Sequence, residues 1–355
     1  MGFVHWRYLL KTHIKALLAV IFIVAFIIFI FTFTETLRRT TVSLEFLMLI
    51  TLYRLPYIMT TLFPYIYLIS TSLTLESLAS SRELIVFHAS GYSMRQILSP
   101  FLCLAGSLSV AWFFALQPFS AYLNHEIQIK EQHYFGMPIT SSTRTNLWLY
   151  QRPSPSQGIL LHVGHMQDSI CSDVSIYLFL QNGVLTEKIF AKTLYFTPGA
   201  WILSQGTIFK MNNLEYQTFT ERRFENTLDA NKILLSLAPP KDIGMYDLFS
   251  IMKVRRKNHL YEEGHTLALH TLGAKSVLIF FMVLVAGCFQ TKHSRLKKSI
   301  SIAKTLLCCL FLHFFMDIFH SLGKQGIILP FWASWVPIFL TGACAFACLS
   351  WKGER

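Results

Sequence analysis

Charged residues are scarce in this chain, and their scarcity narrows the class of protein. Asp, Glu, Lys and Arg make up 14% of the 355 residues, against roughly 25% in a typical soluble domain. Hydrophobic residues reach 53% and aromatic residues 15%. This composition excludes a disordered chain, a collagen-like chain and an ordinary soluble enzyme. A chain this apolar is expected to be surrounded by lipid.

The sequence also lacks the short motifs of common catalytic and metal sites. Its cysteines form no CxxC pair and no spacing typical of zinc ligands. Three partial motifs each lack a required residue: Gln325 interrupts a nucleotide phosphate loop, Ile129 replaces the second histidine of a zinc-protease motif, and Arg95 replaces the closing glycine of a nucleophile elbow. The basic residues behind the net charge of +12 form no stripe with interleaved aromatics. We therefore expect no catalytic residue, no metal site, no cofactor and no nucleic-acid partner.

Several apolar segments are long enough to cross a bilayer, because a spanning helix needs about 20 apolar residues. They cover residues 16–33, 55–75, 96–124, 266–291, 299–322 and 326–351. The second segment follows an interfacial lead-in from Phe46 and is broken by Pro56 and Pro64, and the third ends near Pro118. The expected domains are three spans at 1–124, a polar domain at 125–246, and at 247–355 a connecting helix with three more spans.

Lysine and arginine lie mainly on one side of these spans. Eleven of them precede span one or follow spans two, four and six, whereas the short opposite loops hold only Arg38, Arg39 and Lys324. Positively charged loops remain in the cytoplasm. Both termini are therefore expected to be cytoplasmic, with the polar domain on the far side of the membrane.

The polar domain has the pattern of β-structure. Residues 175–181 and 184–191 flank Asn182-Gly183, which is the strongest two-residue hairpin signal. Further strands are predicted at 193–196, 201–204, 216–224 and 233–237, before an amphipathic connecting helix at 247–270. Short strands at this spacing predict a sandwich or jelly roll. Ile176, Leu178 and Leu180 share one parity of the first hairpin strand and are expected on its inner face.

Four groups of residues follow one another along the whole chain. They are Leu55-Pro56 with Phe63-Pro64, Ser81-Arg82-Glu83-Leu84 with Ala89-Ser90-Gly91-Tyr92-Ser93, Trp201-Ile202-Leu203, and Leu322-Gly323 with Trp335-Val336-Pro337. Together they resemble the LptF/LptG-type permeases of the lipopolysaccharide export ABC transporter of Gram-negative bacteria. The resemblance implies three inner-membrane spans, a periplasmic β-jelly roll and three further spans.

The resemblance also implies a function. A permease subunit of this kind extracts lipopolysaccharide from the inner membrane and passes it to a periplasmic bridge toward the outer membrane, and Ile176, Leu178 and Leu180 would meet its acyl chains. The implied partners are a paralogous permease subunit, a cytoplasmic ATPase dimer that uses the ATP, and a single-span periplasmic jelly-roll protein. Two alternatives are a membrane-anchored scaffold or adhesion protein and a mechanotransmitting permease that moves no lipid.

The segment at about 76–96, between spans two and three, is the expected contact with the ATPase. Arg82, Glu83 and His88 are expected on a short helix, which Gly91 ends with a left-handed residue before Tyr92. In the functional interpretation this is a coupling helix, and Glu83 pairs with a basic group of the ATPase. The alternative is a solvated loop with ordinary interfacial charges.

Three arginines lie on the side of the membrane where the orientation rule disfavours them. Arg38 and Arg39 follow span one, and Arg54 opens span two. Guanidinium groups bind phosphate in a fork geometry. We therefore expect a binding site for an anionic lipid headgroup, with simple interface anchoring as the alternative.

Three polar residues lie within span five. His313, Asp317 and His320 are spaced i, i+4 and i+7, which places them on one helix face. Charged residues within a span are candidates for function by default. The alternative is a hydrogen-bonded His313–Asp317 pair close to the interface.

Overall fold

The computed structural model describes residues 2–39, 43–135, 144–154, 157–167, 170–180, 183–197, 200–211, 215–225, 248–249, 252, 263–289 and 298–353. The chain forms two compact units, one of residues 1–124 and 263–355 and the other of residues 125–262. Among the described residues, 6 helices are long and apolar enough to cross a membrane, and the second unit contains an antiparallel sheet. The predicted class, six membrane helices with an inserted all-β domain, is confirmed.

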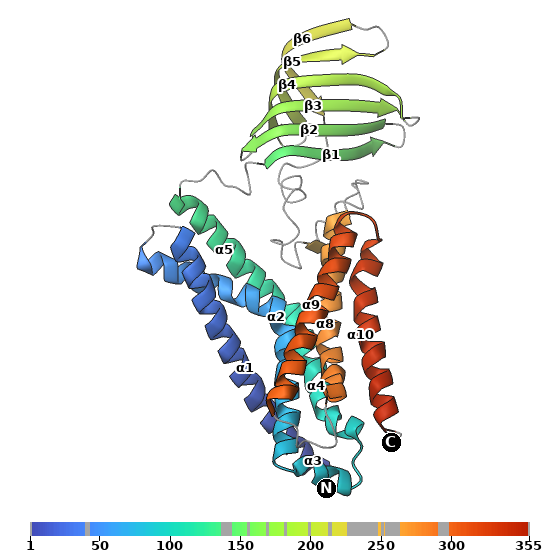
Figure 1. Cartoon of the computed structure of the whole chain (residues 1–355). Helices are drawn as coiled ribbons and strands as arrows, with labels where there is room; N and C mark the ends of the chain where they lie inside the picture. Colours follow the sequence, from blue (N-terminus) through green and yellow to red (C-terminus); the bar gives the residue numbers. More distant parts are fainter. Residues whose placement is uncertain are drawn as a thin grey trace. The chain divides into compact units, whose positions relative to one another are not determined.

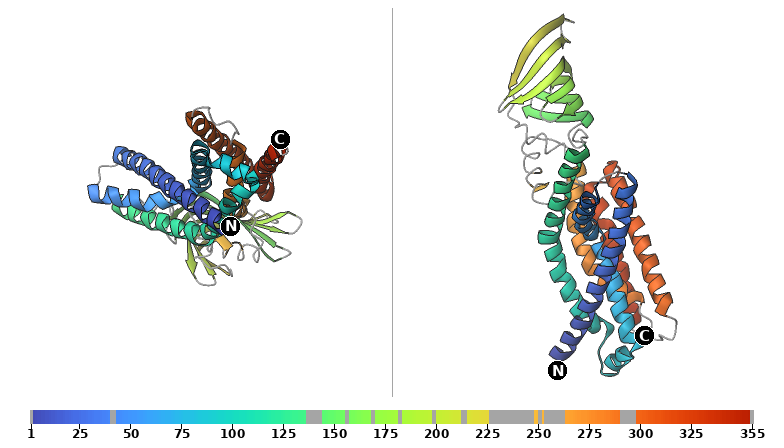
Figure 2. Two further views of the ribbon diagram at one scale, coloured as in Figure 1. Left: turned by 90° about the horizontal axis from the view of Figure 1, so that it is seen from below. Right: turned by 90° about the vertical axis from the view of Figure 1, so that its left-hand side faces the viewer.

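The helices of the described chain are α1 (Gly2–Arg39), α2 (Leu44–Ser80), α3 (Glu83–Ala89), α4 (Met94–Ala111), the π-helix η1 (Trp112–Leu116), α5 (Gln117–Phe135), α8 (Glu263–Phe289), α9 (Lys298–Lys324) and α10 (Pro330–Gly353). The start of α1, helix α3 and the end of α10 lie at the same end of the helical bundle (Figure 1, Figure 2). This arrangement agrees with an even number of spans.

Helix α2 differs from the expected lead-in followed by a span. It runs without interruption from Leu44 to Ser80, with Pro56 and Pro64 inside it, and Figure 1 shows that it changes direction along its length. A proline removes one helical hydrogen bond and bends a helix without ending it when other groups satisfy the freed carbonyl. Most side chains of its second half are buried, among them Ile66, Tyr67 and Leu68, so this half forms part of the core of the bundle.

The third span also continues beyond its expected end near Pro118. Helices α4, η1 and α5 follow one another without a break from Met94 to Phe135. The Gln117 N–H bonds to the Trp112 carbonyl, five residues back, which marks a π turn. Because this turn changes the hydrogen-bond pattern just before Pro118, the proline is accommodated and the helix goes on.

The sheet has six strands, each paired antiparallel with its neighbours in chain order. They are β1 (Arg144–Ser154), β2 (Gln157–Gln167), β3 (Ile170–Leu180), β4 (Leu185–Thr197), β5 (Ala200–Lys210) and β6 (Glu215–Glu225). The hairpin between β3 and β4 is confirmed, with Gly183 at a φ of 79°. The sequence interpretation missed β1 and β2. The described strands form a meander, without a Greek-key crossing among them, and the strand expected at 233–237 lies outside the described residues, as does most of the connecting helix at 247–270.

One irregular line crosses the whole sheet at right angles to its strands. Each of the five ladders omits one facing pair at the same level. We call this line the seam, and its residues are Asn146, Gly164, Asp173, Lys192, Gln205 and Thr220. Asp173 and Gln205 have positive φ angles of 54° and 51°, a conformation that is uncommon for residues other than glycine.

The seam shifts the alternation of side chains by one residue. Cys171 and Val174 are both buried although they lie three positions apart, and the same spacing separates Ala191 from Leu194 in the next strand. Successive residues of a regular strand point to opposite faces. The shift therefore keeps the apolar residues on both sides of the seam in one core, which also includes Ile176 and Trp201.

Candidate functional site

Helix α3 is held against the bundle by one face and exposed on the other. Leu84 and Phe87 are buried, whereas Ile85 and Val86 are 59% and 63% exposed. The His5 ring of α1 lies edge-on to the ring of Phe87, with 5.7 Å between the ring centroids. The exposed pair is an apolar surface at a helix that joins two spans, and the sequence interpretation missed it because it attended to charge.

The charged residues predicted on α3 have different surroundings. Arg82 and His88 are exposed, whereas the partly buried Glu83 interacts with the Tyr8 side chain of α1. Gly91 has the predicted left-handed conformation, with a φ of 85°. Tyr92 turns inward, and its ring lies 5.7 Å from that of His5. Of the five predicted residues, Glu83 and Tyr92 thus contact α1 and help to hold α3 against it.

The three predicted lipid-binding arginines come from α1 and α2. Arg38 is exposed in the last turn of α1, and Arg39 is the last residue of that helix. Arg54 is partly buried and lies within α2. It lies ten residues beyond the first residue of that helix, Leu44, which corresponds to about 15 Å along the axis. The arginine expected to open span two is therefore inside a helix that starts earlier.

The polar residues of α9 separate into two groups. His313 Nε2 lies 3.4 Å from Asp317 Oδ2, and both side chains are substantially exposed on the helix. His320 instead approaches α8, with its Nδ1 3.5 Å from the Thr271 hydroxyl. The predicted pair of His313 and Asp317 is present, and His320 contributes to a different contact between spans.

The predicted inner-face residues of β3 form a gradient of burial. Ile176 is fully buried in the apolar core of the sheet, Leu178 packs against that core while partly exposed, and Leu180 is 44% exposed. Tyr177 and Phe179, of the opposite parity, are partly buried. The inner face therefore becomes accessible toward the β3–β4 hairpin.

A buried histidine in the bundle escaped the sequence interpretation. His13 of α1 is fully buried, and its Nδ1 lies 3.1 Å from the Thr74 hydroxyl of α2. Its ring packs on Tyr67 and Phe101, at centroid distances of 5.1 and 4.8 Å. The only signal of this site in the sequence was a single histidine just before the apolar run of the first span.

Comparison with known proteins decides which family these features belong to. The family model described as "Lipopolysaccharide export system permease LptF/LptG" matches residues 7–351. The chain belongs to this family. The match includes nearly the full length of the six membrane-capable helices among the described residues, and the described sheet. Among curated proteins the comparison finds no match.

Family membership gives the general role of this chain. The family consists of permease subunits of an ABC transporter, and the LptF/LptG chain described here is a multi-pass protein of the inner membrane. Its role is therefore in lipopolysaccharide export.

Proposed function

We propose that this permease subunit extracts lipopolysaccharide from the inner membrane and passes it along its β-domain to a periplasmic bridge toward the outer membrane. The family match over residues 7–351 carries the proposal. The partners would be a paralogous permease subunit, a cytoplasmic ATPase dimer and a single-span periplasmic jelly-roll protein. The permease itself would need no cofactor, since ATP is used by the partner subunit.

The proposed orientation places both termini in the cytoplasm and the β-domain in the periplasm. The distribution of lysine and arginine supports it. The common end of the bundle that holds the start of α1, helix α3 and the end of α10 is consistent with it (Figure 1). In this orientation α3 faces the ATPase, and Arg38 faces the membrane surface from which the lipid is drawn.

The ATPase would bind the exposed side of α3 through Ile85 and Val86. Interfaces between stable partners have an apolar centre surrounded by polar residues. Here Arg82 and His88 are exposed beside the apolar pair. Glu83 would contribute by fixing α3 on α1 through Tyr8, so that a movement of α3 is transmitted to the first span.

The acyl chains of the lipid would enter the inner face of the sheet at its exposed end. Leu180 and Leu178 are accessible there, and Ile176 lies deeper in the core. Apolar chains gain free energy in proportion to the apolar area that leaves water. An acyl chain that displaces the contacts over Leu178 would therefore extend toward Ile176.

Site-specific crosslinking tests this function. A photo-crosslinking residue is placed at Leu178 or Leu180, and in matched controls at Phe179, in vesicles that hold the whole transporter. With ATP, Leu178 and Leu180 are expected to capture lipopolysaccharide and the controls to capture several-fold less. Equal capture at both parities, or none at Leu178 and Leu180, would contradict the proposal.

A further inference from the structure

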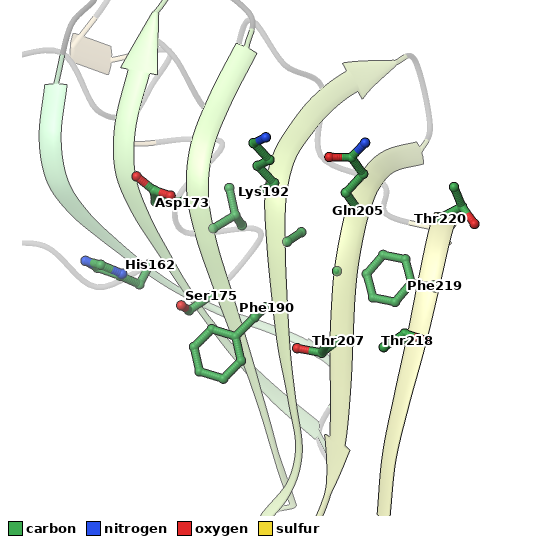
Figure 3. A pocket seen from close by; sticks show the side chains of 13 residues that line it. His162, Asp173, Ser175, Phe190, Lys192, Gln205, Thr207, Thr218, Phe219 and Thr220 are labelled. Atoms are coloured by element: carbon green, nitrogen blue, oxygen red, sulfur yellow. The ribbon is translucent and has the colours of Figure 1, made fainter.

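A groove of about 760 Å³ crosses the sheet, and its lining includes a row of side chains that alternate with those of the apolar core as well as Val174 and Ala191 of that core. It follows the seam across strands β2 to β6 (Figure 3). Ligand pockets in proteins typically have volumes of roughly 300–1,000 Å³. The groove is within this range and lies entirely in the second unit.

The side chains around the groove are mostly hydrogen-bonding groups. The seam contributes a carboxylate, an ammonium, an amide and a hydroxyl, from Asp173, Lys192, Gln205 and Thr220. Next to the seam, a row of paired residues on neighbouring strands contributes further hydroxyl groups, those of Ser175, Thr207 and Thr218. Together these groups donate and accept several hydrogen bonds along one line.

Two phenylalanine rings lie among these polar groups, those of Phe190 and Phe219, and Phe219 also packs against the apolar core. Phe190 is 42% exposed, and Figure 3 shows its ring between the polar side chains of the neighbouring strands. Lys188 Nζ lies 4.4 Å from its centroid and 5.0 Å from that of Tyr177. On the same face, the rings of Trp148 and His162 are 4.2 Å apart. The groove thus continues into a surface of aromatic rings and one cation.

Backbone geometry accounts for the arrangement of the polar side chains. Asp173 and Gln205 have the positive φ angles of the seam. Such conformations have a cost for residues with a side chain, and they occur preferentially at functional sites. If the seam served only to keep apolar side chains in the core, glycine would adopt these positive φ angles at lower cost. The presence of an acid and an amide here indicates a use for their side chains.

We propose that this groove binds a saccharide, and in particular the oligosaccharide headgroup of the transported glycolipid. Sugars present many hydroxyl groups, which pair with carboxylate, amide and hydroxyl side chains, and apolar C–H faces, which pack on an aromatic ring. Lys192 balances the charge of Asp173 in the lining, and Lys188 lies beside the groove over the Phe190 ring, so that a sugar with an anionic substituent is also accepted. The identification of the sugar as part of the cargo rests on the proposed function.

The groove reaches an edge strand of the described sheet. Strand β6 is the last strand of the described sheet, and Thr218 and Thr220 bring the groove to it. A lipid with its acyl chains on the inner face would pass around β6 and place its sugars in the groove. The β-domain would then bind both parts of an amphipathic molecule on separate faces.

The test uses the full-length permease in detergent and the oligosaccharide released from lipopolysaccharide by mild acid hydrolysis, which has no acyl chains. Saturation-transfer NMR is expected to show contact, and titration to show saturable binding. Phe190→Ala and Lys192→Ala are each expected to weaken binding at least fivefold. The control Tyr216→Ala removes a ring that is 76% exposed on β6 outside the groove, and it is expected to leave binding unchanged.

Unaltered binding in both groove variants, or no saturable binding in the wild type, would overturn the site. If the Phe190→Ala variant no longer binds a partner protein but binds the saccharide as before, the groove is a protein-docking site and the saccharide proposal is wrong. Crosslinking of intact lipopolysaccharide at Leu178 distinguishes the two proposals. If it persists while the oligosaccharide fails to bind, the groove proposal is wrong and the permease function remains.

Discussion

The indole N–H of Trp112 donates a hydrogen bond to the carbonyl oxygen of Thr60, at a distance of 3.1 Å. In an α-helix that oxygen would accept from the N–H of residue 64, and Pro64 has none. Trp112 is buried, and it begins the π turn of the third span. A tryptophan from one span thus satisfies the carbonyl that a proline frees in another, as is required where no water is present.

Removal of this donor should destabilise the bundle in a way that depends on Pro64. Trp112→Phe leaves the Thr60 carbonyl unpaired and is expected to cost about 1–3 kcal/mol. Pro64→Ala restores the helical N–H, so the double variant should be less destabilised than the sum of the single variants. Trp332→Phe, at a ring that is 54% exposed, is the control. Thermal unfolding in detergent measures the cycle, and additive effects would contradict the assigned role.

Charge on the exposed side of α3 should prevent ATPase binding. Val86→Glu places a carboxylate in the proposed apolar centre, and it is expected to weaken co-purification of the ATPase by roughly tenfold or more. Ser80→Glu adds the same charge at an exposed position just before α3 and should have little effect. If both variants retain the ATPase equally, α3 does not bind it through this surface.

Tyr8 and Glu83 should act as one unit. Glu83→Ala and Tyr8→Phe each remove the link between α3 and α1, so both are expected to lower lipopolysaccharide export to a similar extent while membrane insertion remains normal. The double variant should be no worse than either single one. Should Glu83→Ala alone abolish ATPase co-purification while Tyr8→Phe does not, Glu83 pairs with the ATPase directly.

Reversal of charge at the end of α1 should abolish lipid extraction. Arg38→Glu with Arg39→Glu replaces two phosphate-binding groups by carboxylates that repel an anionic headgroup. ATPase assembly and basal ATP hydrolysis should persist, because α3 is unchanged. Lys324→Glu makes the same change of sign at the end of α9 and serves as the control. Normal lipopolysaccharide release from vesicles by the double variant would show that the arginines only anchor the helix.

Cys171 should be unreactive in the folded β-domain. Burial disfavours its thiolate and raises the pKa from the ordinary value of 9.0 to about 12. Between these two pKa values the folded thiol stays protonated while the thiol of the unfolded chain ionises. The contribution of Cys171 to the free energy of unfolding is therefore complete below pH 9 and decreases as the pH rises toward 12. Alkylation at pH 9, followed by mass spectrometry, should be at least roughly tenfold slower than in guanidinium, because the nucleophile is the thiolate. Equal rates would show that the core is open.

A thiol at an exposed position provides the reference for this measurement. Tyr216→Cys introduces one on β6, where the native side chain is 76% exposed. It is expected to react at the rate of an unfolded thiol at pH 9, since no burial opposes its ionisation. The contrast between the two positions separates protection by the core from slow alkylation in general.

Local composition was enough to predict the class of this protein. Each span is a run of apolar residues, and such a run is recognisable because the bilayer demands length and hydrophobicity more than any particular partner. The hairpin at Gly183 and the left-handed Gly91 were predictable for a similar reason, since their conformations depend on adjacent residues. Strands β1 and β2 were missed although they pair well in the sheet.

Other features depended on residues far apart in the chain, and only the tertiary structure decided them. Trp112 and Thr60 are 52 positions apart, and no pattern near either residue indicates the other. The seam likewise crosses six strands at one level, and the shift of alternation seen in β3 and β4 has no signature in the sequence of a single strand. The sequence by itself determined which segments enter the membrane and which form β-structure, because both depend on local hydrophobicity. The groove, the exposed side of α3 and the pairing of buried polar groups were decided by packing, because each needs partners that only the folded chain brings together.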